Sequence, residues 1–294
     1  MQSQRETGSS GRPSTGESSH LLTAEELARF KSDGFVVPKF RLPQDEVERL
    51  RALILKLVAD NPEIANFLMR NPHIPDQVIA FGPGTGVRQL KTPPGWMEFA
   101  AHPKILDIIE QISGPDLILR GTAAFYKRPQ KGPATAFHRD AQSQAMKPLE
   151  STHVWIAVTD TRIENACLRF IPGSHKARVS GKHTYNDVNP DGTVGPQLLK
   201  SEYDESEAVD IEVEAGGMIV HDVFTVHGSR SNTGTHERAS FALRFMPGTS
   251  FFDHAATAKV NDNTENGLDK RPLVLVRGVD RAGNNFEIGH PKKK

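Results

Sequence analysis

Hydrophobic residues recur at helical spacing in the first part of the chain and at alternate positions in the rest. Over residues 44–60 the apolar positions mark one helix face, at Val47, Leu50, Ile54, Leu57 and Val58. Residues 103–113 predict a second helix, because proline stands in its first turn and Gly114 follows its last. Thr23 and Glu26 have capping-box spacing, which predicts a shorter helix before both. These helices are expected to support a core built by the rest of the chain.

Beyond residue 114 the period changes to two, which is typical of strands. The strand-like pieces are short and end at Gly, Pro, Ser, Thr or Asp, at residues 117–129, 152–161, 167–173, 209–222, 224–229 and 239–248. A further strand is expected at residues 35–40, and Gly216-Gly217 is typical of a hairpin turn. Many short strands with few helices predict an antiparallel sandwich or jelly roll.

Two long stretches resist regular assignment, residues 70–96 and residues 176–207. Loops of this length in a compact domain are usually lids or binding loops, so both are lid candidates. Residues 1–20 carry no apolar side chain beyond Met1, which predicts a disordered tail. Residues 21–290 are then expected to form a single domain.

Charge and composition narrow the class of partner. Lys plus Arg and Asp plus Glu both number 36, so no net field favours nucleic acid. No apolar run approaches the roughly 20 residues of a membrane span, and no membrane partner is expected. The single cysteine, Cys167, fits a reducing compartment. These features predict a cytoplasmic protein whose partner is neither nucleic acid nor a membrane.

His138 and Asp140 are the first residues that suggest chemistry. If they lie on one strand, residues i and i+2 point to the same face, so an imidazole and a carboxylate converge. Such a pair supplies two of the three ligands of a facial metal triad, but the same spacing is common at surface strand ends. By itself it is therefore weak support for a metal.

A segment 89 residues later strengthens the metal hypothesis. It is expected to place His227 at the end of one strand and Arg238 at the start of the next. Two neutral imidazoles and one carboxylate on one face are the ligands of non-haem Fe(II) oxygenases. The planar guanidinium of Arg238 suits a bidentate grip on a carboxylate, and Ser229 can add a hydroxyl donor from the same face as His227.

From about Leu22 to Pro247 the chain resembles the phytanoyl-CoA dioxygenase family of Fe(II)/2-oxoglutarate oxygenases. The resemblance is clearest in VWIAVTDTRIENACLRFIPGSHK at residues 154–176, and in the His-x-Asp, His-x-Ser and Arg motifs. It implies an α+β, mainly β fold: a double-stranded β-helix (jelly roll, cupin-like) with supporting N-terminal helices. One departure is Ala166-Cys167, where the family usually has Gly followed by Cys or Ser, a change that touches turn geometry.

The resemblance also implies a set of roles for individual residues. Iron would be held by His138, Asp140 and His227 as the catalytic metal centre. The cosubstrate 2-oxoglutarate would contact Arg238, Ser229 and Trp155, with an upstream basic residue for which Arg88 or Lys91 is the nearest match. O2 is then the second cosubstrate, and ascorbate is expected to support turnover. The implied reaction is that of a dioxygenase (hydroxylase), which hydroxylates an unactivated C–H bond of a small-molecule substrate and releases succinate and CO2. Substrate contacts are expected from residues near the iron ligands in sequence, namely Gln142, Gln144 and Arg230.

Alternative functions remain open at this point. The halogenating branch of the superfamily is also similar around Trp155, but it lacks the carboxylate ligand that Asp140 supplies here. Desaturation and ring closure use the same three ligands as hydroxylation. A cupin-like binding domain would hold a metal without turnover, and a zinc hydrolase would need a further Glu as its base. The other histidines are not expected to bind the metal. His175 and His221 are expected to be structural. Histidines near loops are expected to hydrogen-bond water, namely His153, His183, His236 and His254.

Overall fold

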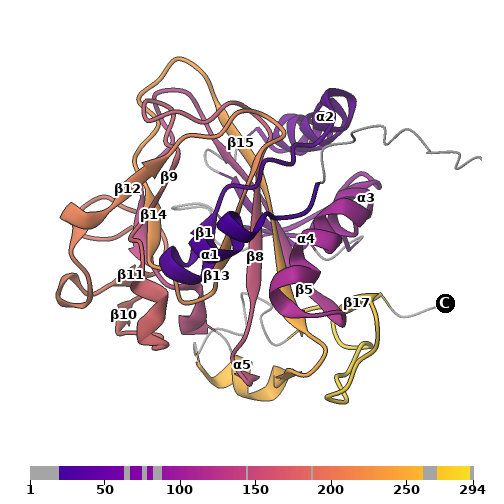
Figure 1. The fold of residues 1–294 in the computed structure, drawn as a ribbon. Coiled ribbons are helices and arrows are strands. Elements are labelled where there is room, and N and C mark those ends of the chain that lie inside the picture. Colours follow the sequence, from indigo (N-terminus) through magenta and orange to yellow (C-terminus); the bar gives the residue numbers. More distant parts are fainter. Residues whose placement is uncertain are drawn as a thin grey trace, which may run out of the picture.

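The computed structural model describes residues 20–62, 67–74, 78–81, 88–143, 145–186, 188–260 and 270–291. The fold is mainly β, with antiparallel sheets and few helices (Figure 1). The tail predicted at residues 1–20 lies, apart from His20, outside the described residues. Within the described part, no helix has the length and apolar character that crossing a membrane requires.

Four helices lie before residue 114 in the part of the chain that the structure describes. They are α1 (Ala24–Asp33), α2 (Gln44–Asp60), α3 (Trp96–Ala100) and α4 (Pro103–Ser113), and a short α5 (His254–Val260) follows late in the sequence. The predicted capping box is present, since Thr23 accepts from the Glu26 amide and Glu26 accepts from the Thr23 amide. The predictions for residues 44–60 and 103–113 match α2 and α4.

A large sheet of nine strands forms one layer. Its path runs β1 (Phe35–Val36), β13 (Met218–Asp222), β8 (Thr152–Ala157), β15 (Arg238–Pro247), β5 (Leu117–Lys127), β2 (Phe67–Arg70), β3 (Val78–Phe81) and β4 (Arg88–Leu90), and β17 (Val274–Arg277) also pairs with β5. Along β8, Val154 and Ile156 pack with the helices, whereas Trp155 and Ala157 face the other way. The alternation that predicted strands therefore reflects two buried faces.

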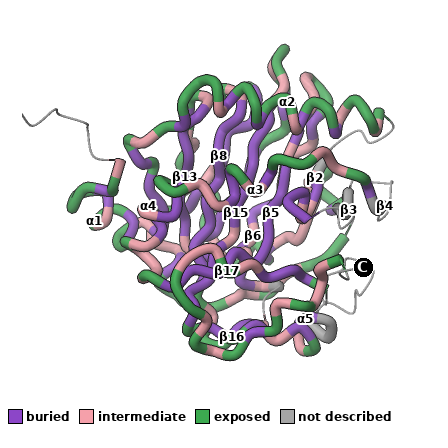
Figure 2. Tube along the Cα trace, turned by 90° about the vertical axis from the view of Figure 1, so that its right-hand side faces the viewer, coloured by how far each residue is buried: buried purple, intermediate pink, exposed green. Residues whose placement is uncertain are grey.

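A smaller sheet of four strands lies on the side of the large sheet away from the helices. Its order is β12 (Val209–Ile211), β9 (Leu168–Phe170), β14 (His227–Ser229) and β6 (Thr135–His138). Trp155 and Ala123 of the large sheet pack with Leu168 and Phe170 of the small one, so an interior lies between the sheets. In Figure 2 the central strands are buried along most of their length, whereas much of α2 is exposed.

Short elements complete the chain. They are two small two-stranded pairs and four 3-10 turns: β7 (Met146–Lys147) with β16 (Phe251–Phe252), β10 (His183–Thr184) with β11 (Gln197–Leu198), η1 (Asp140–Ser143), η2 (Ser174–Ala177), η3 (Lys200–Glu202) and η4 (Glu205–Glu207). The segment 176–207 has little regular structure, as predicted. Leu198 and Tyr203 pack it against Phe137 and Val226 beside the small sheet.

Three local predictions were wrong. Residues 70–96 are not an irregular loop throughout, because β3 and β4 extend the large sheet there and Trp96 is buried at the start of α3. Gly216-Gly217 is a turn but not a hairpin, because β12 before it pairs in the small sheet and β13 after it pairs in the large one. The strand expected at residues 35–40 is limited to Phe35–Val36.

Candidate active site

Three potential metal ligands meet where the small sheet ends. His138 is the last residue of β6, Asp140 begins η1, and His227 begins β14 directly opposite His138. Asp140 Oδ1 is 3.8 Å from His138 Nε2, and Asp140 Oδ2 is 3.9 Å from His227 Nε2. Two ligands each about 2.1 Å from one ion lie at most about 4.2 Å apart, so both carboxylate–imidazole spacings suit a shared ion.

The structure corrects how these residues come together. Asp140 does not share a strand face with His138, because β6 ends at His138 and the chain turns into η1. His227 starts its strand rather than ending it. Arg139, between the first two ligands, faces away from them and donates through Nε to the Phe224 carbonyl.

Both imidazoles are oriented as metal ligands. His138 Nδ1 lies 2.9 Å from the Ala136 carbonyl, and His227 Nδ1 lies 3.0 Å from the Thr225 carbonyl. A carbonyl only accepts, so each Nδ1 must carry the proton and each Nε2 presents a lone pair. Burial, with the neighbouring His138 and His221, holds the pKa of His227 well below its usual range. The ring of His227 is therefore neutral, as metal binding requires.

Asp140 is held by a chain of buried polar groups that the sequence analysis missed. Arg120 donates to Nε2 of His153, and Nδ1 of His153 donates to Asp140 Oδ2 over 2.7 Å. Burial lowers the pKa of His153 to about 3, so the ring is neutral. Burial alone would raise the pKa of Asp140, but the interactions with His153, His227 and Arg244 hold it well below its usual range. The carboxylate is therefore ionised and fixed in direction.

His153 and His221 also form a second group with Asp140 within metal-binding distance. Both nitrogens of His153 are already used, one to donate and one to accept. The group of His138, Asp140 and His227 keeps its ligand atoms available and is the better candidate. The loop interpretation of His153 is wrong, since it lies on β8 and is 2 % exposed. His254 is likewise buried and bonds the Arg271 carbonyl.

Two buried cations lie on the inner face near the third ligand. Lys127, the last residue of β5, pairs across the sheet with Arg238, the first residue of β15. Lys127 Nζ donates to Ser229 Oγ and to the Arg230 carbonyl, each over 2.8 Å. The Arg238 guanidinium donates to the Ala166 carbonyl and lies 5.4 Å from the Trp155 ring. No residue in the described part of the chain accepts a hydrogen bond from its buried Nε.

The electrostatics of this cation pair indicate an anion site. Among the residues that the structure describes, neither Lys127 nor Arg238 forms an ion pair with an acidic side chain. Burial and the charge of Arg238 hold the pKa of Lys127 well below its usual range, and burial lowers the pKa of Arg238 to about 10. Two cations desolvated side by side are costly unless an anion joins them.

The remaining sequence-predicted residues are more scattered. Lys91 follows β4 and is exposed. Strands β2 and β3 lie between β4 and β5 in the large sheet. Arg88 lies on β4, but its side chain lies outside the described residues, as does all of Gln144. Gln142 accepts from the Tyr185 hydroxyl over 2.6 Å. Arg230 is exposed and pairs with Asp210, so it is already occupied.

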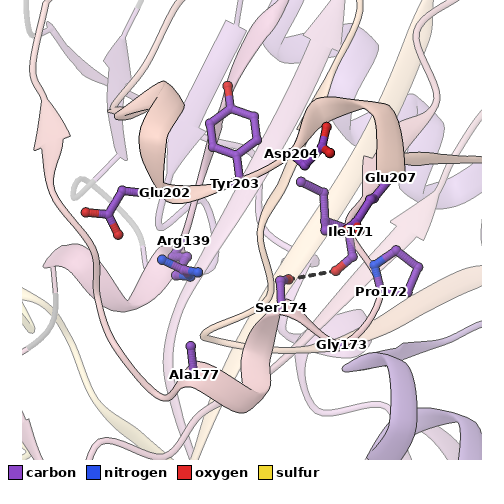
Figure 3. A pocket seen from close by; sticks show the side chains of 10 residues that line it. All are labelled: Arg139, Ile171, Pro172, Gly173, Ser174, Ala177, Glu202, Tyr203, Asp204 and Glu207. Carbon is purple, nitrogen blue, oxygen red and sulfur yellow. Dashed lines mark hydrogen bonds between the residues drawn. The ribbon is translucent and has the colours of Figure 1, made fainter.

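Two surface hollows lie apart from the metal ligands. Figure 3 shows one of about 300 Å3, into which Arg139 points beside Glu202 and Tyr203. A larger hollow of about 700 Å3 is lined by Phe137, Arg169 and Ser229 among others. None of the three candidate ligands lines either hollow.

Comparison with known proteins identifies the class. The chain is 26% identical over 261 residues to "Phytanoyl-CoA dioxygenase domain-containing protein 1 homolog" of Dictyostelium discoideum, covering 77% of this chain and 92% of the relative. The relative of the same name from Caenorhabditis elegans is 30% identical over 52% of this chain, and the match spans about half of its length, 54%.

Solved structures give the same class. The non-heme monooxygenase ThoJ is similar with a TM-score of 0.64 and 25% identity, over 88% of this chain and 85% of that one. The non-heme alpha ketoglutarate dependent carbocyclase SnoK has a TM-score of 0.58 at 21% identity, over 79% and 86%, which shows a shared fold.

The fold and site define a non-haem iron, 2-oxoglutarate-dependent oxygenase. Residues 30–240 match the family "Phytanoyl-CoA dioxygenase (PhyH)". The chain belongs to this family, which confirms the resemblance inferred from the sequence motifs.

Proposed function

We propose that the protein is an Fe(II)/2-oxoglutarate-dependent dioxygenase that hydroxylates an unactivated C–H bond of a small molecule and releases succinate and CO2. His138, Asp140 and His227 would hold the iron through two Nε2 atoms and one carboxylate. Bound iron and 2-oxoglutarate supply the activation of O2 and the oxidising power, and the protein supplies orientation and exclusion of water.

The observation that carries the proposal is the buried pair of Lys127 and Arg238. 2-Oxoglutarate has one carboxylate for the metal and a second that needs a cationic partner. Ser229, which accepts from Lys127, lies two residues beyond His227 on β14. Two strand residues span roughly 7 Å, a distance that a five-carbon diacid can bridge. Lys127 therefore replaces Arg88 and Lys91 as our candidate for the additional basic contact.

Each neighbour of the cation pair has a distinct role in this proposal. Arg238 would grip the distal carboxylate with its free Nε, while its bond to the Ala166 carbonyl fixes the guanidinium plane. Trp155 would cover the site as an apolar wall. Lys127 would donate its hydrogen bonds to the carboxylate, either in place of Ser229 or in addition to it. Ser229 can give up the bond from Lys127 because its hydroxyl can itself donate to the carboxylate.

The proposal also covers the topology, the domain organisation and the cellular compartment. We infer that the two facing sheets form a double-stranded β-helix within a single domain at residues 21–290, and that residues 176–207 act as a lid over the small sheet. The halogenating alternative is not favoured, because the Asp140 carboxylate is present and ionised. A cytoplasmic setting, suggested by the single cysteine, is part of the same proposal.

Succinate formation from 2-oxoglutarate tests the proposal directly, with Fe(II), ascorbate and O2 supplied to the full chain. We expect His227→Ala to abolish it, and near-normal turnover in that variant would contradict the ligand assignment. Lys127→Met and Arg238→Lys should each raise the KM for 2-oxoglutarate at least tenfold while Fe(II) binding persists.

A matched control and a product analysis complete the test. Lys56→Met removes the same charge from the exposed face of α2 and should leave the KM unchanged. A substrate screen by mass spectrometry separates the reaction types, because hydroxylation adds one oxygen, whereas desaturation or ring closure removes two hydrogens. Iron binding without any succinate formation would indicate a binding domain instead.

A further inference from the structure

The strand that ends in the first candidate ligand lies at an edge of its sheet. In the small sheet β6 is the last strand, so within the described residues one of its sides has no partner strand. The segment 176–207 covers that side instead. The Val194 carbonyl accepts from the Ala136 amide over 3.0 Å, and the Val194 amide donates to the Ala134 carbonyl over 2.9 Å. The edge of β6 is therefore closed by the segment that we infer to be a lid.

Beyond the end of β6, the turn that carries Asp140 is held by the same segment. We call residues 180–185 the strap and residues 139–142 the ligand turn. Three hydrogen bonds join them: the Arg139 amide to His183 Nε2 over 3.2 Å, the Tyr185 hydroxyl to Gln142 Oε1 over 2.6 Å, and the Ser180 hydroxyl to the Ala141 carbonyl over 3.4 Å. These contacts flank Asp140 on both sides along the chain.

His183 is oriented to accept from the ligand turn. An amide N–H only donates, so Nε2 of His183 must present a lone pair and Nδ1 must carry the proton. Nδ1 lies 3.3 Å from the Gly181 carbonyl, which can accept that proton. The strap is anchored in turn, because His183 pairs with Leu198 across β10 and β11. Leu198 is fully buried and packs with Phe137, the residue before the first ligand.

The Arg139 amide lies between two of the candidate ligands. The side chain of Arg139 is already fixed, since its Nε donates to the Phe224 carbonyl. Arg139 is 4 % exposed, so water has little access to replace His183 as the partner of its amide. A buried amide without an acceptor is unfavourable, and the chain would rotate to satisfy it. Such a rotation would change the spacing of 3.8 Å between His138 Nε2 and Asp140 Oδ1.

We propose that the strap holds the ligand turn in the geometry that binds the metal, and that His183 is the positioning residue that sets the spacing of His138 and Asp140. The inference rests on the proposed function, because it gives the lid a part in building the iron site. The coupling has to be mutual: a strap that favours the metal-binding geometry is itself stabilised when the metal binds. Closure of the strap and order at the metal centre are then one event.

The first test needs no metal. Hydrogen exchange of the Arg139 amide, followed by NMR in the metal-free full chain, reports its bond to His183. We expect His183→Phe, which keeps an aromatic ring but has no acceptor, to speed this exchange at least tenfold. His183→Gln places an amide oxygen close to the position of Nε2 and should restore most of the protection. Equal exchange in the wild type and in His183→Phe would overturn the inference.

The second test measures Fe(II) affinity by anaerobic titration of the full chain. We expect His183→Phe to bind about tenfold more weakly, the lower end of the effect of groups that orient metal ligands. His183→Gln should bind nearly as well as the wild type. Equal losses in both variants would mean that packing of the ring matters rather than its acceptor, and would contradict the role. His236→Phe replaces an exposed imidazole in the turn before β15 and should bind like the wild type.

Mutual coupling provides a third readout, hydrogen exchange of the strap measured by mass spectrometry. Fe(II) should slow exchange in the peptides that cover residues 180–200, including the Leu199 amide, which bonds the Lys182 carbonyl. In Tyr185→Phe, which lacks the hydroxyl that bonds Gln142, the slowing should be smaller. Exchange of the strap that does not respond to Fe(II) in the wild type would show that the strap and the metal are independent.

The two proposals fail in different ways. If the wild type binds no Fe(II), the proposed function fails, and the role of His183 in metal binding fails with it. If Fe(II) binds and succinate forms but His183→Phe keeps the wild-type affinity, only the inference about the strap is wrong.

Discussion

At the scale of single residues, His153 decides the direction of the Asp140 carboxylate. Its ring passes a hydrogen bond from Arg120 to Asp140, so its tautomer is set by the guanidinium, which can only donate. Groups that orient a metal ligand in this way typically change metal affinity 10–100-fold when they are removed. His153 is therefore a positioning residue in the proposed site.

Two substitutions separate this positioning from packing. His153→Leu removes the donor to Asp140, and we expect Fe(II) affinity to fall 10–100-fold. His153→Asn keeps an amide N–H close to the position of Nδ1 and should recover most of the affinity. Both variants lose the ring nitrogen that accepts from Arg120, so their difference in Fe(II) titration isolates the bond to Asp140. Equal affinity in the two variants would contradict the role.

Residue-level prediction from the sequence worked where the spacing is local and failed where strand pairing decides. His138, Asp140 and His227 share recognisable motifs, and the structure brings them together. Lys127 was missed because its link to Arg238 comes from the β5–β15 register between residues 111 positions apart in the sequence. In retrospect the alternation Ala123, Phe125, Lys127 on one strand face was the available signal.

At the scale of elements, the turn before β9 carries a residue in an unfavourable conformation. Ala166 has a φ of 75°, in the left-handed region that costs an L-residue roughly 1–2 kcal/mol. The family usually has glycine here, and its carbonyl accepts from Arg238. The substitution has therefore kept the glycine backbone shape, which suggests that the carbonyl position matters to the site.

Ala166→Gly should consequently stabilise the protein. Relief of the left-handed strain outweighs the greater freedom of glycine in the unfolded chain, which costs about 0.4–1 kcal/mol. We expect the free energy of unfolding in urea to rise by up to about 1 kcal/mol, with the KM for 2-oxoglutarate unchanged. A clear loss of stability would mean that packing of the buried methyl group dominates.

Elements with strong periodicity were predictable, and elements set by long-range pairing were not. The apolar stripe of α2 and the alternation in β5 and β15 identify these elements from the sequence. Strands β3 and β4 lie in a stretch rich in Pro and Gly, and their strand form depends on joining the edge of the large sheet. The Gly216-Gly217 turn resembles a hairpin locally, but β12 before it pairs with β9 and β13 after it pairs with β8, so the two strands belong to different sheets.

At the scale of the whole molecule, buried neutral histidines make folding depend on pH. Burial lowers the pKa of His73, His153 and His221 each to about 3, against about 6.5 when exposed. Protons then bind the unfolded chain in preference to the folded one. The stabilising contribution is complete above pH 6.5 and is lost as the pH falls toward 3.

The metal-free protein should therefore lose stability steeply in mild acid. Each such histidine contributes about 1.4 kcal/mol per pH unit once it is protonated in the unfolded chain. His73→Gln removes one of them from a position that bonds Thr122, away from the candidate ligands. Its free energy of unfolding, measured by urea between pH 4 and 5.5, should show a slope shallower by about 1.4 kcal/mol per pH unit. An unchanged slope would mean that His73 titrates normally in the folded protein.

The polar contacts of the interior also bear on how the two sheets move. The bond from Lys127 to Ser229 joins β5 to β14, and the bond from His153 to Asp140 joins β8 to η1. One of these bonds lies at each end of the interior, so the two layers can separate fully only when both bonds break. Local opening between the two layers is then a concerted event, and the amide protons of β14 and β6 should exchange with solvent at a common rate. The metal and the cosubstrate would bind residues of these same two hydrogen bonds, so both would slow this exchange.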